Sequence, residues 1–383
     1  MKKQKICIIG GGLTGLVTAL ALSDLDINID LVSDKMNQKL LSNRTVAISE
    51  NNSIFFDFLK NKLWPCSKME LFSQNKNGNF LRVFDLQKDN KKIFYMIENS
   101  KLIKYVFEKI KEKKNINFKN NEKVSKIDFS STLKKVTFKN HSSKYNLIIL
   151  CVGKNSNLTK NVFQDNSLKS SYKEVSFTTI LNHNKFKNDT ARQIFLDKGI
   201  LALLPLSNIK TSIVWTVDKN LNQNNASSIK ENINIVANKF LKNIKFKNSI
   251  ERNDLKFFVR EKYFEDRILL FGDALHTVHP FAGQGFNMIL RDLKNLKKIL
   301  FDRISCGLDI GLSDSLSEFS DQTKPRNFVY SMGLDFLRNC FKPYNKSLKD
   351  LRNIMILNIN KSDYAKNKIY EIADPYIEFN SIE

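Results

Sequence analysis

Three glycines near the start of the chain constrain its fold more than any other feature. They form the pattern Gly10-x-Gly12-x-x-Gly15 between an apolar run at residues 5–9 and a helical pattern at residues 13–22. A strand that enters a helix through such a turn presents the first backbone N–H groups of the helix to one point in space. Those groups are unpaired and lie at the positive end of the helix, so they can hold a phosphate. The pattern therefore predicts a nucleotide-binding turn.

The neighbouring residues extend this prediction. The glycines permit a tight turn, a close approach of a pyrophosphate and close packing of the helix on the strand. The residues expected at the pyrophosphate are Gly10, Gly12, Leu13, Thr14 and Gly15. Residues 27–32 predict a second strand, after which an acidic residue normally binds the ribose. Ser33 stands where this acid is usual, so we expect Asp34 to bind the ribose.

A second motif occupies residues 267–287 and reads RILLFGDALHTVHPFAGQGFN. Its apolar start predicts a strand that ends at Gly272 and Asp273, where the carboxylate can accept hydrogen bonds from the hydroxyls of a ligand. Pro280 and the run Gly283-Gln284-Gly285 predict a turn that opens a helix, whose positive end can stabilise negative charge. This combination of residue types exceeds what a structural strand-loop-helix needs, so we expect a second part of the binding site here.

The hydrophobic periodicity of the remaining chain predicts two interleaved lobes. Short alternating strands, typical of antiparallel sheet, separate segments with strand-helix-strand character. The expected fold class is α/β, with a Rossmann-type lobe, a β-rich second lobe interleaved with it and a helical C-terminal tail. The expected boundaries are residues 1–66, 99–166 and 260–324 for the first lobe, 67–98 and 167–259 for the second, and 325–383 for the C-terminal region.

The charge balance of the chain favours an anionic partner. In 383 residues, 62 Lys+Arg against 39 Asp+Glu give a formal net charge of +23, which favours a lipid surface, a nucleic acid or an acidic substrate. A general bias toward lysine and asparagine, spread over the whole chain, explains the charge equally well. Since no recognised nucleic-acid-binding module accompanies the charge, we expect no nucleic-acid partner.

Cysteine and histidine positions predict neither disulfides nor a metal site. The five cysteines are odd in number, widely spaced and without a C-x-x-C pair, which fits a reducing compartment. His276 and His279 are three residues apart, but no cysteine or third histidine lies near them. We therefore expect a cytoplasmic protein without metal ligands.

Any membrane contact is expected to be peripheral. The chain begins without the apolar region of a signal peptide, and no apolar run approaches the roughly 20 residues that span a bilayer. Between residues 328 and 357, apolar stripes alternate with basic residues, as in helices that lie on an anionic membrane surface. Helices that pack on the first lobe would show the same stripes, so both interpretations stand.

The two glycine-bearing motifs together resemble those of the class A flavoprotein monooxygenases. Within this class the chain resembles the hydroxylases of ubiquinone biosynthesis, which act on polyprenylated phenols. The resemblance covers nearly the whole chain. Besides the two motifs it rests on RTVAIS at residues 44–49, FYMIEN at 94–99, LLPL at 203–206 and SIVWT at 212–216.

This resemblance implies an FAD-binding lobe and roles for individual residues. Arg44 would approach the cofactor, and Asp273 would bind its ribityl chain. The amides around Gly283, Gln284 and Gly285 would face the flavin ring and stabilise its reduced, anionic form. The residues expected to bind FAD are Gly10, Gly12, Leu13, Thr14, Gly15, Asp34, Arg44, Gly272, Asp273, Pro280, Gly283, Gly285, Phe286 and Asn287.

The resemblance also implies a reaction centred on the flavin, without a separate catalytic side chain. NAD(P)H would reduce FAD, O2 would give a flavin hydroperoxide, and one oxygen atom would pass to the ring of a polyprenylated phenol. One segment departs from the family pattern: Val152 replaces an acid and Thr159 an arginine, while Gly153 and Ser156 are retained. Because this segment is associated with the nicotinamide cofactor, the electron donor stays open.

Two other functions are compatible with the sequence. The chain could hydroxylate a soluble aromatic substrate, which calls for a closed cavity lined by arginine. It could also be a non-catalytic FAD-binding subunit of a biosynthetic complex, as Val152 and Thr159 suggest. The expected partners are the prenylated phenol, O2, an anionic membrane at its inner face and a ubiquinone-biosynthesis complex. The ring position, the prenyl length and the oligomeric state are not set by the sequence.

Overall fold

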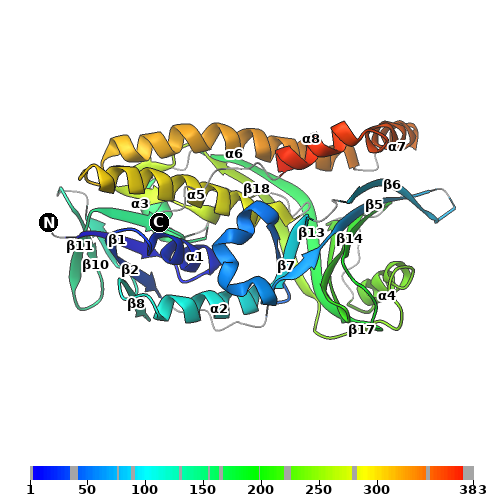
Figure 1. Ribbon diagram of the computed structural model, residues 1–383, viewed down its shortest axis with the longest axis horizontal. Coiled ribbons are helices and arrows are strands. Elements are labelled where there is room, and N and C mark those ends of the chain that lie inside the picture. The colour runs from blue at the N-terminus through cyan, green and yellow to red at the C-terminus, as the bar shows by residue number, and fades with distance from the viewer. Residues whose placement is uncertain are drawn as a thin grey trace.

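The computed structural model gives the arrangement of most of the chain. The residues that it describes are 3–34, 42–75, 77–87, 91–128, 132–153, 156–163, 167–197, 199–219, 226–277, 283–341 and 346–373. Two main sheets lie side by side, and long helices run across both of them (Figure 1). The chain therefore has the predicted α/β fold, with a Rossmann-type sheet, a β-rich sheet and C-terminal helices.

The first sheet forms the core of one half of the molecule. Its strands in spatial order are β19 (Phe264–Glu265), β20 (Ile268–Leu270), β12 (Leu147–Leu150), β1 (Gln4–Ile9), β2 (Ile27–Ser33) and β8 (Ile116–Asn120). All pairs are parallel except the one between β19 and β20. The central strands are almost continuously apolar because both faces of a parallel sheet are covered.

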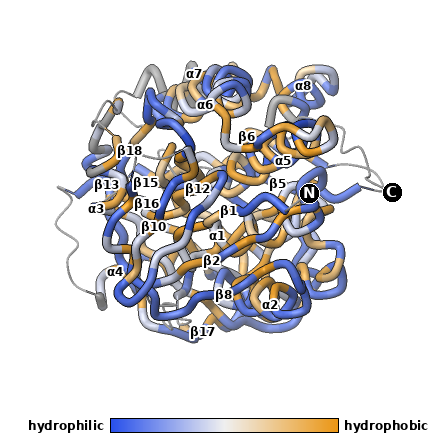
Figure 2. Tube along the Cα trace, turned by 90° about the vertical axis from the view of Figure 1, so that its left-hand side faces the viewer, coloured by the Kyte–Doolittle hydropathy of each residue, from blue (hydrophilic) through white to orange (hydrophobic). Residues whose placement is uncertain are grey.

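Three helices pack beside one another around this sheet. They are α1 (Leu13–Leu22), α2 (Asn99–Lys111) and α5 (Gln284–Ser305), and α1 contacts both of the others. Figure 2 shows hydrophobic stretches, among them α1 and β2, in the interior and hydrophilic stretches mostly on the outside. The helix and strand predicted from the opening glycine motif are thus confirmed.

The second sheet is mostly antiparallel. Its strands in spatial order are β21 (His276–Thr277), β18 (Glu251–Arg260), β13 (Ser167–Asn182), β16 (Lys210–Asp218), β15 (Gly199–Ser207), β14 (Thr190–Leu196), β5 (Lys68–Gln74) and β6 (Phe80–Gln87), with β17 (Lys245–Phe246) beside β13. Alternate residues such as Phe177, Leu201 and Trp215 pack under α4 (Ala226–Ala237). The opposite face is turned toward the first sheet and the C-terminal helices.

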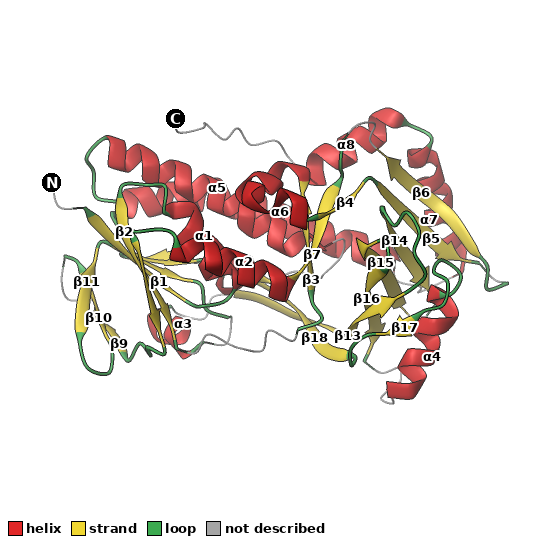
Figure 3. Ribbon diagram, turned by 60° about the horizontal axis from the view of Figure 1, so that its bottom comes forward, coloured by secondary structure: helices red, strands yellow, loops and turns green. Residues whose placement is uncertain are grey.

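Smaller elements complete the fold, and one of them lies between the two main sheets (Figure 3). One small sheet contains β3 (Thr45–Ser49), β7 (Phe94–Glu98) and β4 (Trp64–Cys66); its strands contact α5 on one side and β15 on the other. A second small sheet contains β9 (Lys126–Asp128), β10 (Lys134–Thr137) and β11 (Ser142–Tyr145). The short helices are η1 (Glu50–Lys62), α3 (Asn157–Val162) and η2 (Gly272–Ala274).

The C-terminal helices pack against both halves of the molecule, with contacts to α5 and β19 on the first half and to β6 on the second. They are α6 (Ser313–Phe341), α7 (Lys346–Asn360) and α8 (Asp363–Ala373), and the boundary expected at residue 325 lies inside α6, which runs through Pro325. Leu334 of α6 and Ile356 of α7 pack in one apolar cluster with Phe195 of β14. Arg338, one of the basic residues between the predicted apolar stripes, is buried. Its Nη2 lies 2.8 Å from Oε1 of Glu174.

A buried carboxylate ties several strands of the first lobe together. Asp30 of β2 is 2% exposed and accepts a hydrogen bond of 2.6 Å from the hydroxyl of Tyr145. The ammonium of Lys5 lies 2.8 Å from the same carboxylate, and that of Lys119 lies 3.5 Å from it. Burial alone would raise the pKa of Asp30, but the bonds from Lys5 and Tyr145 outweigh it and hold the pKa below its usual range.

We predict that Asp30→Asn lowers the free energy of unfolding by about 1.5–3 kcal/mol at pH 7, because it removes the buried charge that accepts hydrogen bonds from Tyr145 and from the partly exposed Lys5. A carboxyl with a lowered folded pKa stabilises the fold above its unfolded pKa of about 3.9 and loses that effect as the pH falls through the folded value. The difference between the two proteins should therefore shrink below about pH 4. Urea unfolding of both proteins between pH 3 and 7 measures this difference in the free energy of unfolding.

Asp26→Asn is the matched control, since Asp26 pairs with Lys3 at the surface. Exposed pairs contribute little, so the control should change the free energy of unfolding by less than about 1 kcal/mol. The assigned role of Asp30 is contradicted if both substitutions lower the free energy of unfolding equally. It is also contradicted if the difference between Asp30→Asn and the unchanged protein does not become smaller at acidic pH.

Candidate cofactor and active site

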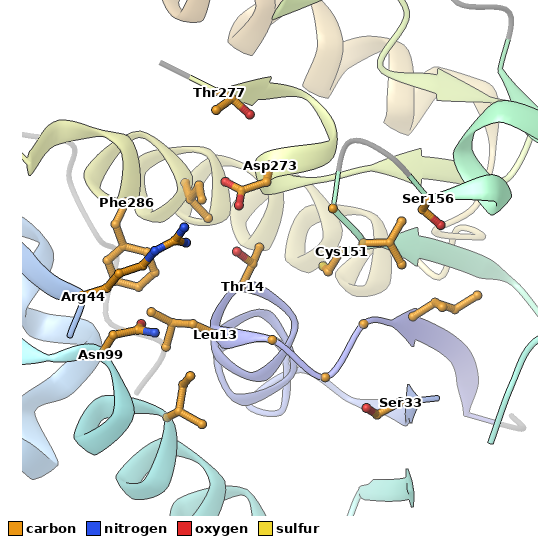
Figure 4. A pocket seen from close by; sticks show the side chains of 18 of the residues that line it. Leu13, Thr14, Ser33, Arg44, Asn99, Cys151, Ser156, Asp273, Thr277 and Phe286 are labelled. Carbon is orange, nitrogen blue, oxygen red and sulfur yellow. The ribbon is translucent and has the colours of Figure 1, made fainter. Parts of the chain in front are cut away.

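One cavity of about 1510 Å³ extends from the end of β2 to the near edge of the second sheet. Both predicted motifs contribute to its wall, and Figure 4 shows side chains from distant parts of the chain converging on it. The predicted site residues that line it are Gly10, Gly12, Leu13, Thr14, Asp34, Arg44, Asp273, Gly283, Gly285 and Phe286.

The first glycine turn is shaped by backbone contacts. Gly10 has a φ of +133°, and a Cβ at this position would lie 2.4 Å from the carbonyl oxygen of Cys151. A Cβ on Gly15 would lie 1.9 Å from the carbonyl oxygen of Gly10. Gly12 differs, because a Cβ there would meet nothing within 4 Å. Two of the glycines are thus required by packing, and the other keeps the cavity open beside the start of α1.

The second motif meets the first at Gly272. This residue has a φ of +66°, and a Cβ on it would lie 2.5 Å from Cγ2 of Thr14. The contact brings the end of β20 against the start of α1 and leaves Asp273 beside Thr14, with its carboxylate turned into the cavity (Figure 4). Gly283, with a φ of +68°, lets the start of α5 approach Ala47 of β3.

Asn287 is predicted to bind FAD, but in the structure its side chain is engaged elsewhere. It is not among the described residues that line the cavity. Its Oδ1 accepts a hydrogen bond of 2.9 Å from the backbone N–H of Ser49, and its Nδ2 donates one of 3.0 Å to the carbonyl of Ala47. The buried amide therefore fastens α5 to β3 and holds the wall of the cavity in place.

Other predicted residues also act through packing or lie elsewhere. Gly15 and Gly272 support the turns from behind, and Gln284 is not among the described lining residues. Pro280 and His279 lie outside the described residues. His276 is buried, with Nε2 3.1 Å from Oδ2 of Asp292, so this pair joins β21 to α5. The described residues contain no cluster of side chains that could hold a metal ion.

The segment that departs from the family pattern touches the cavity only in part. Val152, Gly153 and Ser156 line it. Thr159 is completely buried, and its hydroxyl donates a hydrogen bond of 2.7 Å to the carbonyl of Ser156. Thr159 therefore stabilises the first turn of α3, and of the two substituted positions it is Val152 that faces the cavity.

The sequence motifs miss the wall that the second sheet supplies. Ser176 and Thr178 of β13, Val214 of β16 and Asn253 of β18 line the cavity. Asn253 accepts a hydrogen bond of 2.7 Å from the Arg44 guanidinium, which couples β18 to the segment before β3. Apart from Val214, which lies in the SIVWT segment at 212–216, these residues belong to no motif, and the packing of the two sheets brings all of them to the site.

Comparison with known proteins identifies the cofactor. A family model described as an FAD binding domain matches residues 3–306. The chain belongs to this family. It is an FAD-dependent flavoprotein monooxygenase, an oxidoreductase that hydroxylates an aromatic substrate. The cavity fits FAD, because its walls combine a glycine turn at a helix start, which suits a pyrophosphate, with a carboxylate placed for hydroxyls.

Curated relatives resemble the chain over most of its length. The mitochondrial ubiquinone biosynthesis monooxygenase COQ6 of Dictyostelium discoideum is 25% identical over 96% of this chain and 90% of its own. The corresponding protein of Caenorhabditis elegans is 24% identical and covers 88% of each chain. Ubiquinone hydroxylase UbiM of Neisseria meningitidis is 23% identical over 68% of this chain and 58% of its own.

Solved structures share the fold at lower identity. The p-nitrophenol 4-monooxygenase PnpA of Pseudomonas putida superposes with a TM-score of 0.79 at 14% identity and covers 97% of this chain and 98% of its own. HpxO of Klebsiella pneumoniae, solved with FAD and uric acid, gives a TM-score of 0.77 at 13% identity and covers 97% and 96%. At this identity the likeness shows the fold alone.

We predict that Gly12→Ala weakens FAD binding at least about tenfold without loss of stability in the absence of FAD. The added methyl group meets no protein atom within 4 Å, but it projects into the space where the pyrophosphate approaches the backbone. Calorimetric titration of the apoprotein with FAD measures the affinity, and thermal unfolding of the apoprotein measures the stability.

Gly333→Ala is the matched control, because a Cβ on Gly333 of α6 also meets nothing within 4 Å and lies far from the cavity. It should leave FAD affinity unchanged and stabilise the helix by up to about 1 kcal/mol. Unchanged FAD affinity of Gly12→Ala would contradict the assigned position of the pyrophosphate.

Proposed function

We propose that the chain hydroxylates the aromatic ring of a polyprenylated phenol in ubiquinone biosynthesis. The observation that carries this proposal is the similarity to COQ6 proteins over 96% and 88% of the chain, which extends through the second sheet and the C-terminal helices. The similarity to UbiM supports the same substrate class. Since fold alone does not set the substrate, the chemistry of the cavity has to be considered as well.

We propose that the predicted residues bind FAD in the order in which they line the cavity. Gly10, Gly12 and the start of α1 take the pyrophosphate, and Asp273 takes hydroxyls of the ribityl chain. The amides at Gly283 and Gly285 lie at the start of α5, where the positive helix end favours negative charge on the flavin ring. Arg44 approaches the cofactor from the segment before β3.

The charges of the cavity favour a neutral aromatic ring over an aromatic acid. Arg44 is the sole arginine among the described lining residues, and its guanidinium is engaged by Asn253. The lining lysines, Lys123, Lys139 and Lys256, are exposed. Ser176, Thr178 and Val214 of the second sheet present hydroxyl and apolar groups instead. The buried hydroxyl of Thr178 has no hydrogen-bond partner among the residues that the structure describes, so it is suited to a phenolic hydroxyl.

The overall reaction consumes one O2 and one NAD(P)H. One oxygen atom is inserted into a ring C–H bond to give C–OH, and the other leaves as water after taking up a hydride equivalent from NAD(P)H and one proton from solvent. Bound FAD supplies the oxygen chemistry. The chain orients the ring between Phe286 and the second sheet, and its apolar walls limit the entry of water. NAD(P)H is the donor typical of class A monooxygenases.

We predict that the purified protein with FAD and NADPH or NADH adds one oxygen atom to a prenylated phenol in detergent, which mass spectrometry detects as a gain of one oxygen mass. The same ring without the prenyl chain, carrying a carboxylate, should react at least about tenfold more slowly, because it loses the burial of the chain. In a strain without the gene, quinone profiling should show the unhydroxylated precursor.

Each alternative has its own outcome in these assays. Faster turnover of the soluble aromatic acid would establish a hydroxylase of soluble substrates. A protein that binds FAD but never oxidises either reductant or a prenylated phenol in air would be a non-catalytic subunit of a biosynthetic complex.

We also propose that the C-terminal helices contact an anionic membrane surface at its inner face. Within the part of the chain that is described, no helix is long and apolar enough to cross a bilayer. α6, α7 and α8 lie along one side of the molecule (Figures 1 and 2). Val329 and Phe336 of α6 are 70% and 67% exposed, and Met355 of α7 is 59% exposed. The net charge of +23 favours acidic lipids.

We predict that the double substitution Val329→Glu with Phe336→Glu lowers binding to phosphatidylglycerol vesicles at least about tenfold, because two apolar side chains can no longer enter the interface. Vesicle flotation measures the bound fraction. Ile235→Glu is the matched control, since Ile235 of α4 is 59% exposed on another part of the molecule. Equal binding of all three proteins would contradict the membrane contact.

A further inference from the structure

The end of β2 lacks the carboxylate that this fold normally offers to a ribose. Ser33 occupies the position and is 3% exposed. A Cβ on Gly11 would lie 2.3 Å from its Oγ, so the short side chain of Ser33 is packed directly against the glycine turn. Its hydroxyl carries no negative charge, so Ser33 cannot replace the missing carboxylate. Asp34, the residue expected to replace it, is exposed at the mouth of the cavity.

The neighbouring strand brings a different carboxylate to the same place. β8 pairs with β2 in parallel, and Asn120 lies opposite Ser33 at the end of the ladder. Two residues later the backbone N–H of Glu122 donates a hydrogen bond of 3.0 Å to the carbonyl of Ser33. Glu122 is therefore fixed at the carboxyl end of β2, although it is distant from Ser33 in the sequence.

The side chain of Glu122 lines the cavity and lacks a protein donor for one of its oxygens. The side chain is 31% exposed, but its Oε2 is buried and has no hydrogen-bond partner among the described residues. Nε2 of His141 lies 3.7 Å from Oε2, beyond hydrogen-bonding distance. A buried carboxylate oxygen without a donor is strongly unfavourable. A ligand in the cavity that carries hydroxyl groups would supply the missing donor.

We propose that Glu122 accepts hydrogen bonds from the ribose hydroxyls of the adenosine half of FAD. The contacts around the cavity give the order of the groups: Glu122 adjoins Ser33, Ser33 adjoins Gly11, and Thr14 adjoins Gly272 and Asp273. Along FAD the matching order is ribose, pyrophosphate and ribityl chain. Glu122 thus performs from β8 the function that the end of β2 cannot.

The inference rests on FAD binding alone and is independent of the proposed aromatic substrate. The test uses the full-length apoprotein and its Glu122→Gln variant, titrated calorimetrically with FAD and with an FAD analogue whose adenosine ribose lacks both hydroxyls. Gln keeps the shape of the side chain and removes its charge. We expect the variant to bind FAD about tenfold to a hundredfold more weakly than the unchanged protein does. For the analogue, we expect the variant and the unchanged protein to have the same affinity.

Two further variants separate the alternatives. Asp34→Asn tests the exposed acid at the mouth and should weaken FAD binding less than Glu122→Gln does. Glu108→Gln on the surface of α2 is the matched control and should bind FAD as the unchanged protein does. Equal weakening of FAD and the analogue by Glu122→Gln would mean that Glu122 only supports the fold, and it would overturn the proposal. So would unchanged FAD binding by Glu122→Gln, or a loss confined to Asp34→Asn.

Discussion

The contact between Gly272 and Thr14 is the constraint on which the site depends. A strand end and a helix start approach so closely that a single Cβ on Gly272 would lie 2.5 Å from a Thr14 side-chain atom. This approach needs both the left-handed backbone of Gly272 and the tight turn that Gly10 and Gly15 form against Cys151. If either turn opened, the pyrophosphate end and the Asp273 end of the cavity would separate.

The interleaved topology explains why the site has walls from two sheets. The chain leaves the first sheet after β12, forms most of the second sheet and returns at β20 with the motif that carries Asp273. β21, within the same motif, pairs with β18 and forms one edge of the second sheet. The cofactor lobe and the substrate wall are thus joined covalently within a few residues, and the amide of Asn287 adds a second connection through β3.

The comparisons distinguish the architecture, which distant relatives share, from the substrate preference, which depends on the residues of the cavity walls. PnpA and HpxO share nearly the whole architecture at 14% and 13% identity, so the shared scaffold tolerates wide changes in sequence. Substrate choice in such a scaffold depends on the side chains of the cavity wall, here those of β13, β16 and β18. The uncharged groups at Ser176, Thr178 and Val214 are therefore more informative about the substrate than the glycine motifs are.

The sequence by itself determined the features that depend on local sterics and periodicity. The glycine turns, the buried strands, the start of α5 and the position of Asp273 follow from neighbouring residues, because a tight turn or a helix start requires particular residue types within a few positions. Tertiary structure decided the rest. Glu122 and Asn253 reach the cavity through strand pairing and sheet packing, Asn287 is diverted to β3, and Arg338 is buried against Glu174 instead of facing solvent. These contacts join residues that are far apart in the chain. No local pattern in the sequence specifies which distant group a side chain will contact.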